Sequence, residues 1–194
     1  PMTFNDKNIL IYNGEIYNHL AIRKFLKNEH DINFISNSDT ETLYYLLKYL
    51  PLKKALNMLS GMFAFCYFDH QKNKILIGRD RAGEKPVYLY FNNKIFGISS
   101  DITTFKKLDP AALVINQNAI TNYMNYSYIP NPQTIYKNCF KMPPGSSIEI
   151  NLHNFSFHKL NNFNEIKKID NFIYNKWWNV NKVNRIIFNN EDDI

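Results

Sequence analysis

Short apolar runs separated by polar, turn-forming residues dominate the first part of the chain, which is the pattern of strands joined by turns. Residues 7–12 form an apolar run that ends at Asn13-Gly14, so they predict a strand entering a tight turn. Residues 61–69 are apolar almost throughout, as expected for a strand buried on both faces. We expect residues 74–80 to pair with that strand across a turn at residues 70–73.

Other segments carry apolar residues at helical spacing. We expect helices at residues 18–28, at residues 38–50, from Pro51 onward for a short stretch, and at residues 118–126. The first of these should have four apolar residues on one face, namely Leu20, Ile22, Phe25 and Leu26. The second has helix-start signals, because Ser38 or Asp39 can cap it and Glu41 adds negative charge to its first turn.

The remaining segments predict short strands and one irregular connection. We expect strands at residues 32–35, 87–91, 94–98, 147–151 and 156–160, the second and third of which form a hairpin. Residues 130–144 are punctuated by proline and should be irregular. Beyond about residue 161 the chain becomes polar and rich in Asn and Lys. We therefore predict an α+β domain at residues 1–160, with stacked sheets covered by helices, and a linker plus the start of another domain at residues 161–194.

Charge and cysteine content exclude several classes of protein. The net charge of +6 is spread over scattered lysines, which argues against a nucleic-acid-binding protein. The five histidines show no metal-ligand spacing, so we predict no metal site. Cys66 and Cys139 make no disulfide framework, which fits a reducing cytoplasm. No stretch approaches the ~18 apolar residues of a membrane span, so we predict no membrane association.

The motif Asn13-Gly14-Glu15 is weak by itself, because Asn-Gly between apolar runs usually marks a hairpin turn. It gains meaning from the segments that accompany it in order, which read LIYNGEIYNHLAIRKFL, SDTETLYYLL, LSGMFAFCYFD, ILIGRDRAGEKPVYLY, FGISSDI, YSYIPNPQTIYKN and KMPPG. From about residue 7 to residue 145, this series resembles the glutaminase domain of glutamine-hydrolysing asparagine synthetase. That domain is a class II, N-terminal-nucleophile glutamine amidotransferase. The YIPNPQTIYKN and KMPPG segments favour the asparagine synthetase branch.

The resemblance implies a fold and a site. The fold would be the αββα sandwich of N-terminal-nucleophile hydrolases, with two stacked, mostly antiparallel sheets flanked by helices, here incomplete at its N-terminus. The Asn13 amide and the Gly14 backbone N–H would form an oxyanion hole, and both would contact glutamine. Glycine would suit position 14 because a side chain would crowd the approach of the backbone to the substrate. Glu15 would line the glutamine pocket, and Asp39 would hold the α-ammonium group of glutamine. From its position alone, Asp39 would be a helix N-cap, a role compatible with ligand binding.

The family's nucleophile and its ATP site are both missing from the printed sequence. The family begins with Cys-Gly-Ile after the initiator Met, whereas this chain begins at Pro1. We expect neither Cys66, a mid-strand apolar filler, nor Cys139, which has no flanking base, to replace that cysteine. The Ser-Gly-Gly-x-Asp-Ser loop that binds ATP in the family does not occur before Ile194. We therefore expect a fragment that does not hydrolyse glutamine by itself.

The complete protein implied by the resemblance would convert ATP, aspartate and glutamine into asparagine, glutamate, AMP and diphosphate. Mg²⁺ would accompany the ATP, no cofactor would bind this chain alone, and the family suggests homodimers. Two alternatives stay open at this stage. The acceptor could be another carboxylate, as in the modification of a surface polysaccharide or peptide. The chain could also be a non-catalytic remnant.

Overall fold

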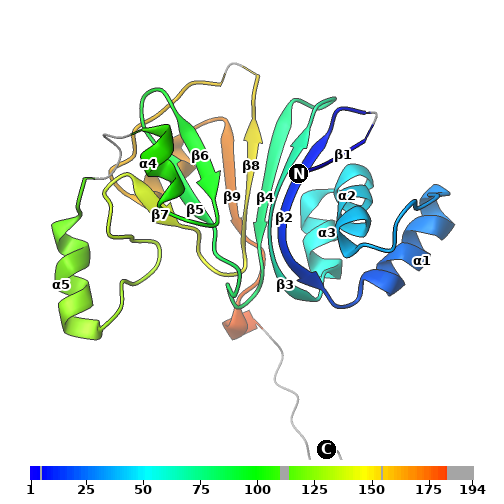
Figure 1. Cartoon of the computed structure of the whole chain (residues 1–194), viewed down its shortest axis with the longest axis horizontal. Coiled ribbons are helices and arrows are strands. Elements are labelled where there is room, and N and C mark those ends of the chain that lie inside the picture. Colours follow the sequence, from blue (N-terminus) through cyan, green and yellow to red (C-terminus); the bar gives the residue numbers. More distant parts are fainter. Residues whose placement is uncertain (5, 110–113, 154, 183–194) are drawn as a thin grey trace, which may run out of the picture.

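Two antiparallel sheets lie face to face in the structure, a computed structural model that describes residues 1–4, 6–109, 114–153 and 155–182 (Figure 1). The larger sheet has the order β1-β2-β3-β4-β8-β9, and the smaller has the order β6-β5-β7. The strands of the larger sheet are β1 Met2–Thr3, β2 Ile9–Ile16, β3 Gly61–Asp69, β4 Lys74–Arg79, β8 Ser146–Asn151 and β9 Phe172–Lys176. The strands of the smaller sheet are β5 Tyr88–Phe91, β6 Phe96–Ser99 and β7 Cys139–Lys141.

Helices flank the two sheets (Figure 1). Their bounds are α1 His19–His30, α2 Asp39–Tyr49, α3 Leu52–Met58, α4 Thr104–Leu108, α5 Gln117–Tyr126, η1 Phe163–Lys168 and η2 Val180–Lys182, the last two being 3₁₀ helices. Helices α1 to α3 pack on the larger sheet, on the right in Figure 1. Helix α4 packs on the smaller sheet, where Phe105 stacks on Tyr90. The result is the predicted order of helix, sheet, sheet and helix.

Alternation along the central strand β3 supplies two separate cores. Phe63, Phe65 and Tyr67 point toward the helices and join the core between α1–α3 and the larger sheet. Ala64 and Cys66 point the other way, toward the core between the two sheets. The prediction that this strand is buried on both faces is confirmed.

The predicted helices and hairpins are present, each helix within two residues of its expected bounds. β3 pairs with β4, and β5 pairs with β6, as predicted. The predicted apolar face of α1 holds only in part, because Leu20 is 70% exposed while Ile22 and Leu26 are buried. Helix α4 was not predicted, since a five-residue helix contains too few turns to show a period.

The strand that carries Asn13 and Gly14 does not end in a tight turn, so that prediction was wrong. β2 continues to Ile16, and Gly14 is paired with Phe63 of β3. An Asn-Gly pair ordinarily marks a hairpin between adjacent strands, but here the partner strand follows three helices later in the sequence.

Two further predicted strands are not found in the described part of the chain. Residues 32–35 form no strand, because the N–H groups of Ile35 and Ser36 bond to the Glu41 carboxylate instead of to a neighbouring strand. Residues 156–160 form none either, and the edge of β8 is paired by β9.

The segment after residue 160 packs onto the same two sheets. β9 pairs with β8 along five residue positions. Phe163 and Phe172 are buried in the core between the sheets. The domain boundary at residue 160 stays a prediction, but the packed unit continues beyond it. Residues 183–194, the last part of the predicted linker and start of another domain, lie outside the described residues.

Candidate functional site

Asn13, Gly14 and Glu15 are consecutive residues of β2, and the glycine is required by the local backbone. Gly14 has a φ of +145°, a conformation that side chains with a Cβ rarely adopt. A Cβ there would lie 2.1 Å from the carbonyl oxygen of Met62 on β3. The neighbouring strand therefore requires glycine at this position, and crowding of the substrate by a side chain stays a prediction.

The N–H of Gly14 points to an open edge of the sheet. Tyr17 N donates to the Ser60 carbonyl at 2.8 Å, so the odd-numbered residues of β2 bond to β3. The N–H groups of the even-numbered residues, Gly14 among them, point away from β3. On that side, in the part of the chain that the structure describes, β1 pairs only with Ile9 and Leu10. Gly14 thus offers a backbone donor at an uncovered stretch of strand.

The side chain of Asn13 leaves β2 on the face opposite the helices. It is exposed, and within the described residues it makes no hydrogen bond. It borders an apolar cavity of about 250 Å³, which is also lined by Ile11, Cys66, Ile75, Val87 and Ile98. Glu15 follows two positions later and is exposed on the same face. The Asn13 amide and the Gly14 N–H therefore belong to neighbouring residues, one on the face of β2 and the other at its open edge.

Asp39 reaches the same strand from the start of α2. The helix cap is Ser38, whose side chain accepts from Thr40 N at 3.1 Å, so Asp39 is not the cap. Its Oδ2 instead accepts from the Tyr12 hydroxyl at 2.7 Å and from Ile16 N at 2.9 Å. The structure therefore places the Asp39 carboxylate on the open edge of β2, between the residues that flank Asn13-Gly14-Glu15.

A buried carboxylate, Glu41, fixes the loop that leads into Asp39. Glu41 is fully buried and accepts from the N–H groups of Ile35 and Ser36, both at 2.8 Å. Its Oε2 also lies 3.4 Å from the Arg23 guanidinium. Burial raises the pKa of Glu41, but the hydrogen bonds from Ser36 and Ile35 and the charge of Arg23 outweigh it, so the pKa is lowered. Glu41 is thus ionised at neutral pH and holds α1, the loop and α2 together.

Phe63, the residue paired with Gly14, is fixed by contacts with Asp80 and Trp177. Its N–H donates to Asp80 Oδ2 at 3.3 Å, and its carbonyl accepts from Asp80 N at 2.8 Å. The Trp177 ring stacks on Phe63 at 6.2 Å, and the Arg81 guanidinium lies 5.2 Å from the Trp177 ring. Asp80 also accepts from three N–H groups of its own loop. Asp80 and Arg81 therefore support the part of β3 that pairs with Gly14.

Neither cysteine is placed to act as a nucleophile. Cys66 pairs with Ile11 and lines the same cavity as Asn13, which sequence reasoning did not foresee. Burial raises the pKa of the Cys66 thiol to about 12, and burial does the same for Cys139. Both thiols are therefore protonated at neutral pH, and thiolates are the reactive form.

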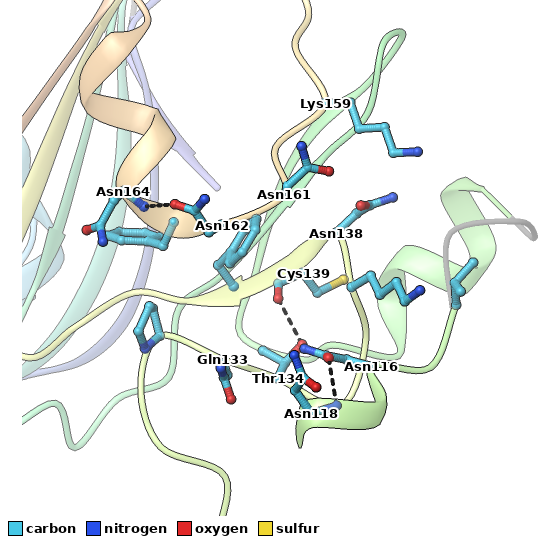
Figure 2. A pocket seen from close by; sticks show the side chains of 15 residues that line it. Asn116, Asn118, Gln133, Thr134, Asn138, Cys139, Lys159, Asn161, Asn162 and Asn164 are labelled. Carbon is cyan, nitrogen blue, oxygen red and sulfur yellow. Dashed lines mark hydrogen bonds between the residues drawn. The ribbon is translucent and has the colours of Figure 1, made fainter. Parts of the chain in front are cut away.

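A larger cavity, of about 730 Å³, lies between the loop before α5, β7 and the loop before η1 (Figure 2). Figure 2 shows amide side chains at several points of its wall, with Lys159 at the rim. Part of this amide lining is bonded internally, since Asn116 Oδ1 accepts from Asn118 N and Asn162 Oδ1 accepts from Asn164 N. None of the predicted site residues borders this cavity.

Among the described residues, no helix is long and apolar enough to cross a membrane. The same residues include no group of three or more His, Cys, Asp or Glu side chains arranged to hold a metal ion.

Comparison with known proteins shows the family of the chain. A profile of the family described as a glutamine amidotransferase domain matches residues 1–161. The chain belongs to this family. It is similar to a putative glutamine-hydrolysing asparagine synthetase 2 of Methanocaldococcus jannaschii, with 37% identity over 137 residues, covering 69% of this chain and 25% of that protein. It is also similar to asparagine synthetase 1 of Bacillus subtilis, with 29% identity over 152 residues, covering 77% of this chain and 23% of that protein.

The chain thus spans about a quarter of the length of these relatives. The resemblance to the glutaminase domain of asparagine synthetase is confirmed.

Solved structures agree on the fold. The chain is similar to "Structure of the allosteric regulatory enzyme of purine biosynthesis", with a TM-score of 0.53, 19% identity, and coverage of 78% of this chain and 28% of the other. It is also similar to the glutamine phosphoribosylpyrophosphate amidotransferase of B. subtilis, with a TM-score of 0.52, 18% identity, and coverage of 81% and 30%. The predicted fold class, an N-terminal-nucleophile hydrolase-like αββα sandwich, is confirmed.

Proposed function

We propose that this amidotransferase domain is the glutaminase part of a glutamine-dependent asparagine synthetase. The main support is the arrangement on β2, where the Gly14 N–H points to an open strand edge, the Asp39 carboxylate bonds to Ile16 N on that edge, and the Asn13 side chain is exposed on the face opposite the helices. The names of its relatives support the asparagine synthetase assignment.

In the proposed reaction, the side-chain amide of glutamine lies against the Asn13 side chain and the Gly14 N–H. Attack by a thiolate turns its carbonyl oxygen into an oxyanion, and the two N–H donors stabilise that charge. The Asp39 carboxylate attracts the α-ammonium group and so sets the orientation of the substrate. Glu15, on the same face as Asn13, completes the glutamine pocket.

We assign the nucleophile to the N-terminal cysteine that the resemblance implies. Cys66 and Cys139 are unsuited to the task, because burial keeps both thiols protonated at neutral pH. We therefore propose that the 194-residue chain by itself does not hydrolyse glutamine.

The rest of the proposed reaction belongs to the complete protein. There, released ammonia would convert an ATP-activated aspartate into asparagine. The printed sequence has no Ser-Gly-Gly-x-Asp-Ser loop, so its residues do not fit an ATP and Mg²⁺ site and none is assigned to them. A cytoplasmic homodimer is part of the same proposal, and the two free cysteines fit a reducing compartment.

Glutamine hydrolysis by the native protein tests this proposal. We expect glutamate release by the wild-type protein and a kcat about 100- to 1,000-fold lower in Asn13→Ala, because one oxyanion donor is lost. Asn28→Ala, which changes an exposed residue of α1, serves as the matched control and should keep full activity. No glutamate release by the native protein, or full activity of Asn13→Ala, would contradict the proposed function. Turnover by the 194-residue chain alone would contradict its predicted inactivity.

A further inference from the structure

The hydroxyl group of Tyr12 is bonded to the carboxylate that we place in the glutamine site. Tyr12 immediately precedes Asn13 on β2 and is half-buried, with its side chain on the helix-facing side. Its Oη donates to Asp39 Oδ2 at 2.7 Å, and Ile16 N donates to the same oxygen at 2.9 Å. Both donors therefore come from the strand that carries the oxyanion donors.

These two bonds occupy one oxygen of Asp39 and leave the other unbonded. Among the described residues, Asp39 Oδ1 makes no hydrogen bond. A carboxylate at the first turn of a helix ordinarily interacts with N–H groups of its own helix, but Ser38 fills that role here. Asp39 is thus turned away from α2 and toward β2, with Oδ1 free to accept from a ligand.

The Tyr12 hydroxyl is a permanent donor in this pair. Burial, followed by the hydrogen bond to Asp39 and its charge, raises the pKa of Tyr12 well above its usual range. The phenol therefore stays protonated throughout the physiological pH range. A hydrogen bond from a neutral phenol to an ionised carboxylate is one of the stronger classes of hydrogen bond in proteins.

We propose that Tyr12 is a positioning residue for glutamine, holding Asp39 Oδ2 so that Oδ1 meets the α-ammonium group of the substrate. This inference rests on the proposed function. Tyr12 touches no reacting atom, so its loss should weaken recognition of the ammonium group and leave the oxyanion donors in place.

The test is glutamine hydrolysis by the native protein and its Tyr12→Phe variant. We expect KM for glutamine to rise about ten-fold with kcat changed less than two-fold, since one charge-assisted hydrogen bond is lost. The inhibition constant of L-glutamate should rise by a similar factor. That of glutarate, which has the same carboxyl groups but no ammonium group, should not change. A purely structural role would weaken both inhibitors equally.

Tyr44→Phe provides a matched control, because the Tyr44 hydroxyl also donates to a carboxylate, that of Asp6, away from the site. We expect this variant to lower thermal stability without changing KM or either inhibition constant.

A second variant, at the carboxylate that Tyr12 holds, extends the test. Asp39→Asn retains an acceptor for Tyr12 but loses the charge that attracts ammonium, so it should raise KM for glutamine at least as much. Adding Tyr12→Phe to Asp39→Asn should then cause little further rise, because both changes act through one carboxylate.

Different experimental results would contradict the proposed function and the role of Tyr12. Absence of glutamine hydrolysis by the wild-type protein would remove the proposed function and this role with it. Hydrolysis by the wild-type protein with unchanged KM in Tyr12→Phe, or equal weakening of glutamate and glutarate, would overturn the role of Tyr12 alone.

Discussion

Gly14 and Gly61 lie near each other across β2 and β3, and at each glycine the backbone of the opposite strand occupies the space that a side chain would need. A Cβ at Gly14 would lie 2.1 Å from the Met62 carbonyl oxygen, and a Cβ at Gly61 would lie 2.1 Å from the Glu15 carbonyl oxygen. Their φ angles are +145° and +144°. The close approach of the two backbones at this point therefore needs glycine in both strands.

Replacing Gly14 by alanine should destabilise the protein even before activity is considered. We expect Gly14→Ala to lower the free energy of unfolding by about 3 kcal/mol, because the clash is with backbone and the φ angle is unfavourable. Urea denaturation followed by circular dichroism measures this change. Gly61→Ala should lose a comparable amount because its clash is the counterpart of the first. A loss below about 0.5 kcal/mol in either variant would contradict the argument.

The residues of the candidate site were predictable from sequence only as a motif, not as a geometry. Asn13, Gly14, Glu15 and Asp39 were identified by resemblance, and the structure connects Asp39 to the strand that carries the other three. Tyr12 was missed, because an aromatic residue at an alternating strand position normally predicts core packing. Only the position of α2 beside the open edge of β2 shows that its hydroxyl has a carboxylate partner.

At the scale of elements, the junction of α1, the following loop and α2 depends on one buried charge. Glu41 replaces the strand pairing that the sequence predicted for residues 32–35, since its carboxylate accepts the N–H groups of Ile35 and Ser36. A buried carboxylate that loses its charge leaves the Arg23 guanidinium unpaired. The orientation of Asp39, two residues earlier on α2, depends on the same junction.

We expect Glu41→Gln to lower the free energy of unfolding by about 3 kcal/mol at pH 7. The pKa of Glu41 is lowered in the folded protein, so its contribution is fully present above the unfolded pKa of about 4.3 and is lost as pH falls through the folded value. The difference between wild type and variant should therefore be constant from pH 7 to pH 5 and shrink below about pH 4. Urea titrations across this range measure it.

Glu29→Gln, at an exposed position on α1, is the matched control for Glu41→Gln and should change stability by less than about 0.5 kcal/mol. A stability difference for Glu41→Gln that stays the same down to pH 3 would show that ionisation of Glu41 is not its cause.

The elements themselves were predicted best where the signal was local and strong. The apolar run at residues 61–69 coincides with β3, because burial on both faces leaves no other interpretation for so short a run. The strand expected at residues 156–160 was wrong, and β9 at Phe172–Lys176 was missed. β9 is an edge strand with exposed residues such as Ile173, so its sequence shows little of the usual apolar pattern.

At the scale of the molecule, the residues after position 160 complete the fold. Phe163, Ile166 and Phe172 are buried between the sheets, and Trp177 lies against Phe63. Each fully buried apolar side chain contributes about 1.5–3 kcal/mol. Together the contributions of these side chains equal a large share of the net free energy of unfolding of a domain, which is about 5–15 kcal/mol.

A chain ending at residue 160 should therefore show no cooperative urea transition, whereas a chain ending at residue 178 should unfold cooperatively. Near-ultraviolet circular dichroism and urea denaturation of the two chains compare them directly. Cooperative unfolding of the shorter chain, with a midpoint equal to that of the longer one, would place the boundary of the folding unit at residue 160.

The stacking of Trp177 on Phe63 also determines when, during synthesis of the chain, the site can form. Trp177 follows Gly14 by 163 residues in the sequence, yet it packs on the residue that pairs with Gly14. A ribosome adds about 5–20 residues per second, so about 10–30 s separate the synthesis of Gly14 from that of Trp177. During that interval the nascent chain carries its glutamine motif without the packing behind it. The site should become fully formed only late in translation, close to the time at which the whole domain leaves the ribosome.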